Sequence, residues 1–161
     1  MEIDIKTSVI QVSELLIGRN QSLAVAESCT GGWLAKVCTD LPGSSAWFDR
    51  GYVTYSNDAK HDMLGVSEST IESHGAVSSE TVVEMVSGTL KHSHADWAIA
   101  ISGVAGPGGG SDINPVGSVW FAWMKKNQNP HTIKKIFSGD REQVRQQSVE
   151  FALEELAKLL I

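Results

Sequence analysis

Apolar residues recur at helical spacing in three long segments of the chain. In residues 5–18 they return every three or four positions, which predicts an amphipathic helix. The same spacing predicts a helix over residues 78–92 and another from Asp140 to about Leu160. Asp140 and Gln143 resemble a capping box at the start of the last of these helices. The pattern thus predicts a helix at each end of the chain and one in its middle.

Five shorter apolar runs predict β-strands between these helices. They cover residues 22–27, 47–55, 96–103, 116–124 and 131–137. Because strands alternate with helices in the first part of the chain, the pattern favours a layered α/β fold, and the three consecutive strands that follow imply a mixed sheet. The sequence contains no linker or internal repeat, so we interpret residues 1–161 as one domain.

Two short helices are predicted directly after strands. The first starts at Ser28, which occupies an N-cap position, and continues to about Cys38. The second is the segment NDAKHDML, with Ser56 as its N-cap and Gly65 at its C-terminal end. Ser28, Ser56 and the glycine loop at 103–110 all follow strands, and ligands in such folds bind outside the carboxyl ends of the strands. These loops are therefore where the sequence predicts a site.

The composition argues against several classes of partner. The 161 residues carry 13 basic and 19 acidic side chains, a net charge of −6, so nucleic acid is not expected as the main partner. No apolar run approaches the ~18 residues of a membrane span, and the N-terminus lacks the uninterrupted apolar segment of a signal peptide. Cys29 and Cys38 lie too far apart on one predicted helix for a disulfide, and free thiols fit a reducing cytoplasm. Two such cysteines do not make a structural zinc site, so no metal site is predicted.

The stretch AESCTGGW contains the first candidate nucleophile. Ser28, at a strand-to-helix junction, is either a helix N-cap or a nucleophile whose oxyanion nearby backbone N–H groups stabilise. The sequence lacks G-x-S-x-G, so this is not a hydrolase elbow of the usual kind. Cys29 is either a rival nucleophile, because a helix N-terminus lowers a thiol pKa, or a small buried side chain. The residue pattern leaves these alternatives open.

A serine nucleophile needs a base, and Lys60 is the candidate. It lies one turn past a predicted strand end, and a lysine acts as a general base when burial or neighbouring groups lower its pKa. The alternative is a solvated lysine on a helix surface. None of the five histidines lies in a motif that points toward Ser28.

Two further features are candidates for binding an anion. The loop GVAGPGGG lacks the G-K-[S/T] of a Walker A loop and contains no G-x-G-x-x-G, yet its flexibility suits close approach of the backbone to a ligand. Arg141, in SGDR at a predicted helix start, is either an anion clamp or a surface arginine. We interpret four tryptophans as core or sheet-face residues rather than a stacking platform: Trp47, Trp97, Trp120 and Trp123.

Several long motifs occur in a fixed order: AESCTGGWLAK, LPGSSAWFDRGYVTYSNDAK, LGV, HGAVS, ISGVAGPGGG, NPVGSVW and FSGDR. From about Ala26 to the start of the last helix, the sequence resembles the CinA C-terminal-domain family in its stand-alone, single-domain form. The resemblance implies a three-layer α/β/α sandwich with a mixed, largely parallel sheet. It also implies hydrolysis of the carboxamide of nicotinamide mononucleotide to nicotinate mononucleotide and ammonia, in pyridine-nucleotide recycling. The implied mechanism uses a Ser/Lys pair, with no metal and no cofactor.

The resemblance further implies roles for individual residues. Ser28 becomes the nucleophile, Lys60 its general base, and Tyr55 a group that positions or relays the proton. We infer that the backbone N–H groups of Thr30 and Gly31 hold the oxyanion. Candidate contacts to the nucleotide phosphate come from the PGSS turn, the glycine loop and the last helix: Ser44, Ser45, Gly106, Gly108, Gly109 and Arg141. Where many relatives read SNEAK, this chain reads SNDAK, which leaves Tyr55 and Lys60 in place.

Three alternatives stand beside this hypothesis. A family member can keep the fold and bind nucleotides without catalysis, although an intact Ser28 and Lys60 count against this. The same machinery can act on another carboxamide. The family's name suggests a protein-interaction role linked to DNA uptake or damage, but the acidic balance argues against direct DNA binding. We expect a cytoplasmic enzyme with a small-molecule substrate, no nucleic-acid or membrane partner, and a homo-oligomeric state, most simply a dimer.

Overall fold

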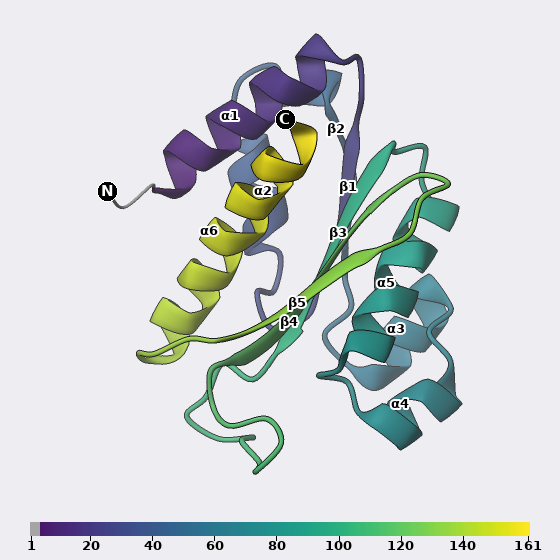
Figure 1. Cartoon of the computed structure of the whole chain (residues 1–161), viewed down its shortest axis with the longest axis vertical. Helices are drawn as coiled ribbons and strands as arrows, with labels where there is room; N and C mark the ends of the chain where they lie inside the picture. Colours follow the sequence, from purple (N-terminus) through teal and green to yellow (C-terminus); the bar gives the residue numbers. More distant parts are fainter. Residues whose placement is uncertain (1–3) are drawn as a thin grey trace.

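One five-stranded β-sheet forms the middle layer of the computed structural model, which describes residues 4–161 (Figure 1). The helices are α1 (Ile5–Gly18), α2 (Trp33–Thr39), the 3₁₀ turn η1 (Ser44–Ala46), α3 (Asn57–Leu64), α4 (Glu68–His74), α5 (Ser79–Lys91) and α6 (Arg141–Leu160). The strands are β1 (Leu23–Glu27), β2 (Phe48–Val53), β3 (Trp97–Gly103), β4 (Ser118–Lys125) and β5 (His131–Ile136). The predicted single domain spans residues 1–161, and its residues 1–3 lie outside the described range.

The strands follow the order β2-β1-β3-β4-β5 across the sheet. β1 pairs in parallel with both β2 and β3, whereas β4 runs antiparallel to its neighbours β3 and β5. Within the described residues, four strands therefore point one way and β4 alone points the other. The predicted mixed, largely parallel sheet is confirmed.

Helices cover both faces of this sheet. Figure 1 shows α1, α2 and α6 on one side of it, and α3, α4 and α5 on the other. On one of these sides α5 packs directly on the sheet, and α3 and α4 pack against α5. With helices on both faces of the sheet, the predicted three-layer α/β/α sandwich is confirmed.

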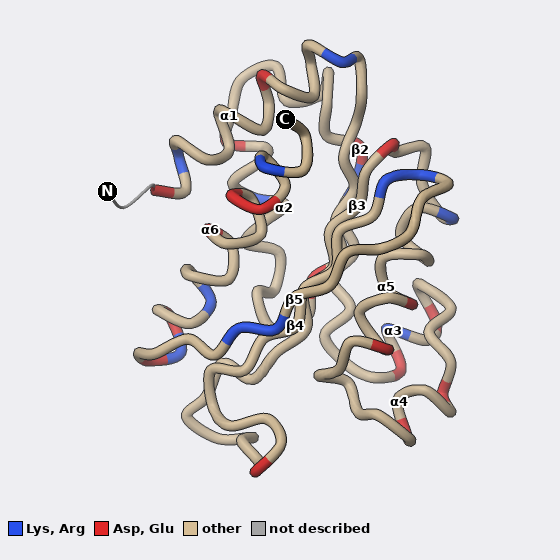
Figure 2. The backbone as a smooth tube through the Cα atoms, in the orientation of Figure 1, with Lys and Arg blue, Asp and Glu red and all other residues tan. Residues whose placement is uncertain are grey.

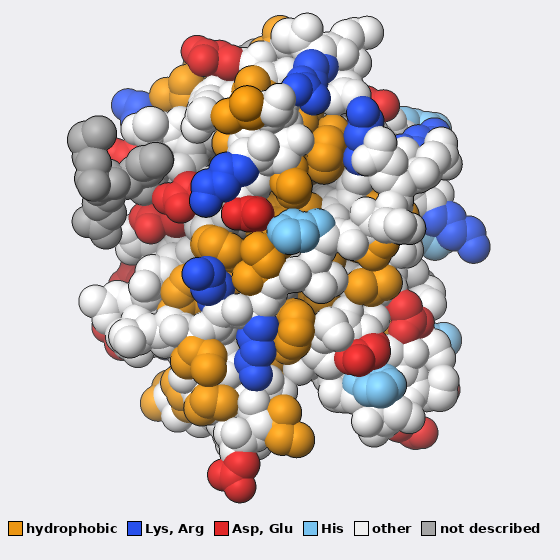
Figure 3. Space-filling model, viewed as in Figure 1, with side chains coloured by type: hydrophobic (Ala, Val, Ile, Leu, Met, Phe, Trp, Pro, Cys, Tyr) orange, Lys and Arg blue, Asp and Glu red, His pale blue; other side chains and the backbone are white. Residues whose placement is uncertain are grey.

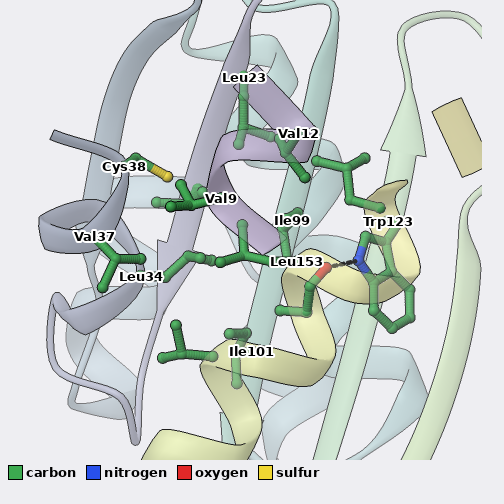
Figure 4. Packing of buried hydrophobic residues seen from close by; sticks show 14 of the residues in the cluster. Val9, Val12, Leu23, Leu34, Val37, Cys38, Ile99, Ile101, Trp123 and Leu153 are labelled. Carbon is green, nitrogen blue, oxygen red and sulfur yellow. Dashed lines mark hydrogen bonds between the residues drawn. The ribbon is translucent and has the colours of Figure 1, made fainter. Parts of the chain in front are cut away.

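Alternation along the strands divides the apolar core into two clusters. In β3, Ile99 and Ile101 belong to the cluster that contains α1, α2 and α6, whereas Ala98 and Ala100 belong to the cluster beneath α5. Large side chains such as Leu153 fill the first cluster (Figure 4). Both faces of the sheet are thus packed, and the loops at its ends project from a rigid support.

Two features of the helices differ from the sequence prediction. The helix expected to start at Ser28 starts at Trp33 instead, because the chain first makes a turn in which Gly31 and Gly32 have φ values of 59° and 100°. Cys29 consequently lies in this turn and not on a helix. The sequence analysis missed α4, which contains no buried residue and so carries no apolar stripe.

The other predicted helix boundaries agree with the structure. The side chain of Ser56 accepts a hydrogen bond at the start of α3, and Gly65 ends that helix with a φ of 71°. Asp140 and Gln143 form the predicted capping box of α6. These local signals therefore fix where α3 and α6 begin, and both helices later supply residues to the site.

No helix within residues 4–161 is long and apolar enough to cross a membrane. Figure 2 shows acidic and basic residues interspersed along most of the chain, with basic stretches in the hairpin of β4 and β5. Buried apolar residues lie on α1, α5 and α6, whereas α4 contains no buried residue.

Candidate active site

The carboxyl ends of β1, β2 and β3 meet at one edge of the sheet, which is the lower edge in Figure 1. The register pairs Glu27 at the end of β1 with Val53 of β2 on one side and with Ile101 of β3 on the other. The loops that follow these three strands therefore begin side by side. Ser28, Tyr55 and the glycine loop all lie in them.

Ser28 and Lys60 are in direct contact at this edge. Lys60 Nζ lies 3.1 Å from Ser28 Oγ. Both residues are buried, with exposed fractions of 1% for Lys60 and 7% for Ser28. The hydroxyl of Ser56 accepts a hydrogen bond from Ala59 N at 3.0 Å and so fixes the turn of α3 that carries Lys60. The fold thus brings together two residues that the sequence analysis paired across 32 positions.

The surroundings of Lys60 favour its neutral form. Burial lowers the pKa of Lys60 from its ordinary value of 10.5, because the ammonium loses its hydration, while interaction with Cys29 opposes this decrease. Lys60 Nζ also donates to Thr54 O at 3.0 Å. A neutral amine that gives one N–H to this carbonyl still has a lone pair for the hydroxyl proton of Ser28. The pair is therefore arranged for proton transfer from Ser28 to Lys60.

Cys29 has a different environment, although it is the next residue. It belongs to the apolar cluster on the α6 side of the sheet and is 6% exposed. Burial raises the pKa of its thiol to about 12, and the charge of Glu27 adds to the increase. A thiol with this pKa stays protonated near neutral pH and is a poor nucleophile. The electrostatics of the site therefore favour Ser28 over Cys29.

The sequence analysis missed Glu27, whose carboxylate binds the turn after Ser28. Its side chain is buried and accepts hydrogen bonds from Thr30 Oγ1 at 2.7 Å, Leu34 N at 2.8 Å and Ala35 N at 3.0 Å. Leu34 and Ala35 lie in the first turn of α2, so Glu27 satisfies N–H groups that an N-cap side chain ordinarily satisfies. An acidic residue at the end of the apolar strand LAVAE was the one available signal.

The sequence analysis also missed Arg145, which reaches the same turn from α6. Its Nε donates to Cys29 O at 3.0 Å, and its Nη2 donates to Thr30 O at 3.2 Å. The guanidinium also lies over the ring of Trp33, 5.5 Å from its centroid. These contacts join positions more than 100 residues apart, so no local pattern could have revealed them.

A cavity of about 300 Å³ opens beside Ser28 and Lys60. Figure 3 shows the molecule hollowed at its lower end, between the part that carries the loop after β3 and the part that carries α4. Residues from these two sides line the cavity: Gly106, Gly108 and Gly109 from the glycine loop, and Ala76 and Val77 from the connection between α4 and α5. The predicted glycine loop therefore forms a wall of the same site as Ser28.

Arg141 bridges two sides of this cavity. Its Nη1 donates to Gly106 O at 2.9 Å, and its Nη2 donates to the hydroxyl of Tyr55 at 3.0 Å. Tyr55 in turn presents its backbone carbonyl to Ser28 Oγ at 3.5 Å. The two contacts of Arg141 use two of the five N–H donors of a guanidinium, so the cation can also bind an anionic ligand.

Two predicted oxyanion donors do not line the cavity. The N–H of Gly31 donates to Ser28 O at 3.0 Å and is therefore engaged within the turn. Thr30 is completely buried, and its hydroxyl donates to Glu27. In a helix that started at Ser28, the first N–H groups would point toward the hydroxyl, but α2 starts at Trp33. The turn before Trp33 instead keeps the N–H of Gly31 within the turn, and neither Thr30 nor Gly31 is among the residues that line the cavity.

Ser44 and Ser45 lie away from the cavity. They belong to η1, which precedes the amino end of β2, whereas the site lies at the carboxyl ends of the strands. β2 is 6 residues long, which corresponds to about 20 Å. Within this chain, the PGSS turn and Ser28 are thus at opposite edges of the sheet.

The polar groups that face the cavity suit an organic ligand with an anionic part. They include the hydroxyl of Ser28, the amine of Lys60, the amide of Asn57 and the guanidinium of Arg141. Across residues 4–161, no group of three or more His, Cys, Asp and Glu side chains is arranged to hold a metal ion.

Comparisons with known proteins identify close relatives. A family model described as the CinA C-terminal domain matches residues 6–160. The curated nicotinamide-nucleotide amidohydrolase PncC of Escherichia coli (strain K12) is 55% identical over 146 residues, which cover 91% of this chain and 88% of that protein. The protein of the same name from Pseudomonas putida is 48% identical over 155 residues, 96% of each chain.

A solved structure matches the whole fold. The crystal structure of the competence damage-inducible protein A (ComA) from Klebsiella pneumoniae subsp. pneumoniae MGH 78578 superposes with a TM-score of 0.95 at 42% sequence identity. The match covers 98% of each chain. The three-layer architecture described above is therefore shared by a protein whose structure has been solved.

Proposed function

Because this chain belongs to the CinA C-terminal domain family, we propose that it hydrolyses the carboxamide of nicotinamide mononucleotide through a Ser/Lys pair. The family resemblance seen in the sequence motifs is confirmed, and curated relatives that align over most of their length carry the name nicotinamide-nucleotide amidohydrolase. The observation that supports the mechanism is the 3.1 Å contact between Lys60 Nζ and Ser28 Oγ beside a cavity.

In the first half of the reaction, Ser28 Oγ attacks the carbon of the carboxamide. Neutral Lys60 takes the hydroxyl proton as the new C–O bond forms, and the carbonyl oxygen becomes the oxyanion of a tetrahedral intermediate. Lys60 then gives this proton to the amide nitrogen. The C–N bond breaks, ammonia departs, and an ester between Ser28 and the nicotinate group remains.

In the second half, water cleaves this ester. Lys60 is neutral again after ammonia has left, so it accepts a proton from the attacking water. It then returns the proton to Ser28 Oγ as the acid is released. The carbonyl of Thr54, 3.0 Å from Lys60 Nζ, holds the amine in one orientation through both halves of the cycle. One lysine therefore acts alternately as base and acid.

We propose that Arg141 and the glycine loop bind the nucleotide phosphate. A guanidinium forms strong charge-assisted hydrogen bonds with phosphate, and backbone N–H groups of Gly106, Gly108 and Gly109 can approach it closely because these residues have no side chain. Tyr55, 60% exposed and hydrogen-bonded to Arg141, would orient the guanidinium. Its hydroxyl is directed to Arg141, so positioning fits the geometry better than a proton relay to Ser28.

A panel of carboxamides tests the choice of substrate. Turnover is measured for nicotinamide mononucleotide, nicotinamide riboside, free nicotinamide and the dinucleotide, each with the wild-type protein and with Ser28→Ala. The proposal expects the highest kcat/KM for the mononucleotide and no turnover of any compound by Ser28→Ala. Preference for a carboxamide without phosphate would contradict the proposed ligand. Binding without turnover by the wild type would identify a nucleotide-binding module instead.

A further inference from the structure

The turn that carries the nucleophile is built from residues with little intrinsic rigidity. Residues 28–32 read SCTGG, and the two glycines adopt φ values that L side chains rarely adopt. Within residues 4–161, Ser28 Oγ itself has only two hydrogen-bond contacts, at 3.1 Å to Lys60 Nζ and 3.5 Å to Tyr55 O. The orientation of the hydroxyl therefore depends on what holds the backbone of the turn.

The local sequence also permits a competing arrangement. Ser28 is a favourable N-cap residue, and a helix that started directly after it would turn its hydroxyl toward the N–H groups of residues 30 and 31. A serine engaged in that way does not present its hydroxyl to Lys60. The native structure avoids this arrangement by starting α2 at Trp33.

Glu27 holds the turn from the side of the sheet. Its buried carboxylate ties Thr30, in the turn, to the first residues of α2 through three hydrogen bonds of 2.7 to 3.0 Å. Its backbone oxygen accepts from Thr54 N at 2.8 Å, and Thr54 O in turn binds Lys60. One residue thus links the turn of the nucleophile to the strand end that orients the base.

Arg145 holds the same turn from the side of α6. Its guanidinium donates to the carbonyl oxygens of Cys29 and Thr30, the two residues that directly follow Ser28. Packing over the ring of Trp33 limits the motion of the guanidinium. Glu27 therefore binds hydrogen-bond donors of the segment and Arg145 binds its acceptors, so together they fix both kinds of polar group.

We propose that Glu27 and Arg145 are positioning residues that clamp the turn after Ser28 and thereby aim its hydroxyl at Lys60. This inference rests on the proposed function, since it assigns how that site is held in its reactive geometry. Neither Glu27 nor Arg145 is among the residues that line the cavity. Their side chains hydrogen-bond to the turn and to the start of α2. Their effect is on the rate of nucleophilic attack and not on the binding of the nucleotide.

The experiment compares Arg145→Ala, Arg145→Lys, Glu27→Gln and the double variant Glu27→Gln/Arg145→Ala with matched controls. Arg50→Ala is the control for the arginine, because Arg50 Nη1 also donates to a backbone oxygen, that of His92, at 3.1 Å. Glu84→Gln is the control for the carboxylate, because Glu84 accepts from Ser67 N at the start of α4 at 3.0 Å. Both controls remove a similar contact without touching the turn.

Two readouts are measured for each folded variant. The first is kcat and KM for nicotinamide mononucleotide. The second is the rate at which a fluorophosphonate labels Ser28, followed by intact mass, which reports the reactivity of the hydroxyl without the substrate. Adding guanidinium ion, far below denaturing concentration, tests whether it restores the lost group of Arg145→Ala.

We expect Arg145→Ala and Glu27→Gln to lower both kcat and the labelling rate by about 10²-fold, as for a misplacement of about 1 Å. KM should stay within about twofold, because the cavity groups that bind the nucleotide are unchanged. Guanidinium should restore part of the rate in Arg145→Ala and none in Arg50→Ala. The double variant should lose about as much as the stronger single variant, because both residues hold one turn.

Unchanged labelling and unchanged kcat in Arg145→Ala would overturn the clamp, as would equal losses in Arg50→Ala and Glu84→Gln. If Glu27→Gln does not fold, the arginine variants and the guanidinium rescue are sufficient to test the clamp. A wild-type protein that is labelled at Ser28 but does not hydrolyse the mononucleotide would refute the proposed substrate. The labelling rates of the variants would then test the clamp. A wild-type protein that shows neither reaction would overturn both.

Discussion

Replacing Lys60 with methionine should remove the base and simultaneously change how stability depends on pH. Methionine has a similar length and carries no charge, so it can occupy the buried space beside Ser28 without hydration. Lys60 is 1% exposed, and burial lowers its pKa from 10.5. The wild-type fold therefore binds the proton of Lys60 more weakly than the unfolded chain does.

The direction of the effect follows from this difference in proton binding. Below the pKa of Lys60 in the folded protein, the lysine is charged in both states, and the full burial penalty destabilises the fold. Between that pKa and 10.5, only the unfolded state keeps the proton, so stability rises with pH. The rise is at most about 1.4 kcal/mol for each pH unit. Above 10.5 the penalty has disappeared, because both states are neutral.

The assay is urea unfolding of the wild type and Lys60→Met over a series of alkaline pH values, analysed as the difference between their free energies of unfolding. Other titrating groups are common to both proteins and cancel in this difference. We expect the free energy of unfolding of the wild type to increase relative to that of Lys60→Met as pH rises toward 10.5. The same folded-state pKa should set the pH at which kcat/KM of the wild type rises on the acidic side of its pH profile. A difference that stays flat with pH would show that burial does not weaken the proton binding of Lys60, and would refute the reasoning.

Three further predictions concern other residues. Cys29→Ala should keep at least most of the wild-type kcat in the ammonia assay, because a thiol of pKa about 12 takes no part as a thiolate; loss of turnover would make Cys29 the nucleophile. Arg141→Ala should raise KM for the mononucleotide by about 10- to 100-fold, the value of a charge-assisted hydrogen bond, and should change KM for the riboside much less; equal effects on both would place the phosphate elsewhere. Leu153→Ala, in the core cluster of Figure 4, should lower the free energy of urea unfolding by about 2–5 kcal/mol with KM unchanged; a change below 1 kcal/mol, about half the lower end of that range, would contradict the packing described.

The layer architecture could be predicted from the sequence because the strands and the long helices carry local apolar or capping signals. The alternation of Ile99 and Ile101 with Ala98 and Ala100 is visible in the apolar run of β3, and Asp140 with Gln143 marks the start of α6 by a local rule. α4 shows the limit of this approach. It has no buried residue, so its helical spacing leaves no apolar stripe to detect.

Within the site, the candidate pair was accessible from sequence, but the support around it was not. Ser28 and Lys60 are candidates because each follows a strand end, the family resemblance assigns them their roles, and the fold brings these strand ends together. The start of α2 was mispredicted because the cap comes from Glu27, through contacts that skip over the turn, and not from the neighbouring serine. Arg145 contacts that turn from the far end of the chain, which no local pattern encodes.

Two of the six candidate phosphate contacts lie away from the cavity for a related reason. Ser44 and Ser45 belong to a conspicuous PGSS motif, yet the direction of β2 puts that motif at the edge of the sheet opposite Ser28. Arg141 and Gly106, which are far apart in sequence, are instead hydrogen-bonded to each other beside the cavity. Strand direction, which fixes these distances, becomes known only with the topology.

The most direct test of the proposed function is ammonia release from nicotinamide mononucleotide, with EDTA present, by the wild type, Ser28→Ala and Lys60→Met in parallel. We expect release by the wild type alone, and retention of nucleotide binding by both variants. Release by Ser28→Ala at the wild-type rate would contradict the proposed nucleophile, and no release by a wild type that still binds the mononucleotide would contradict the proposed amidase activity.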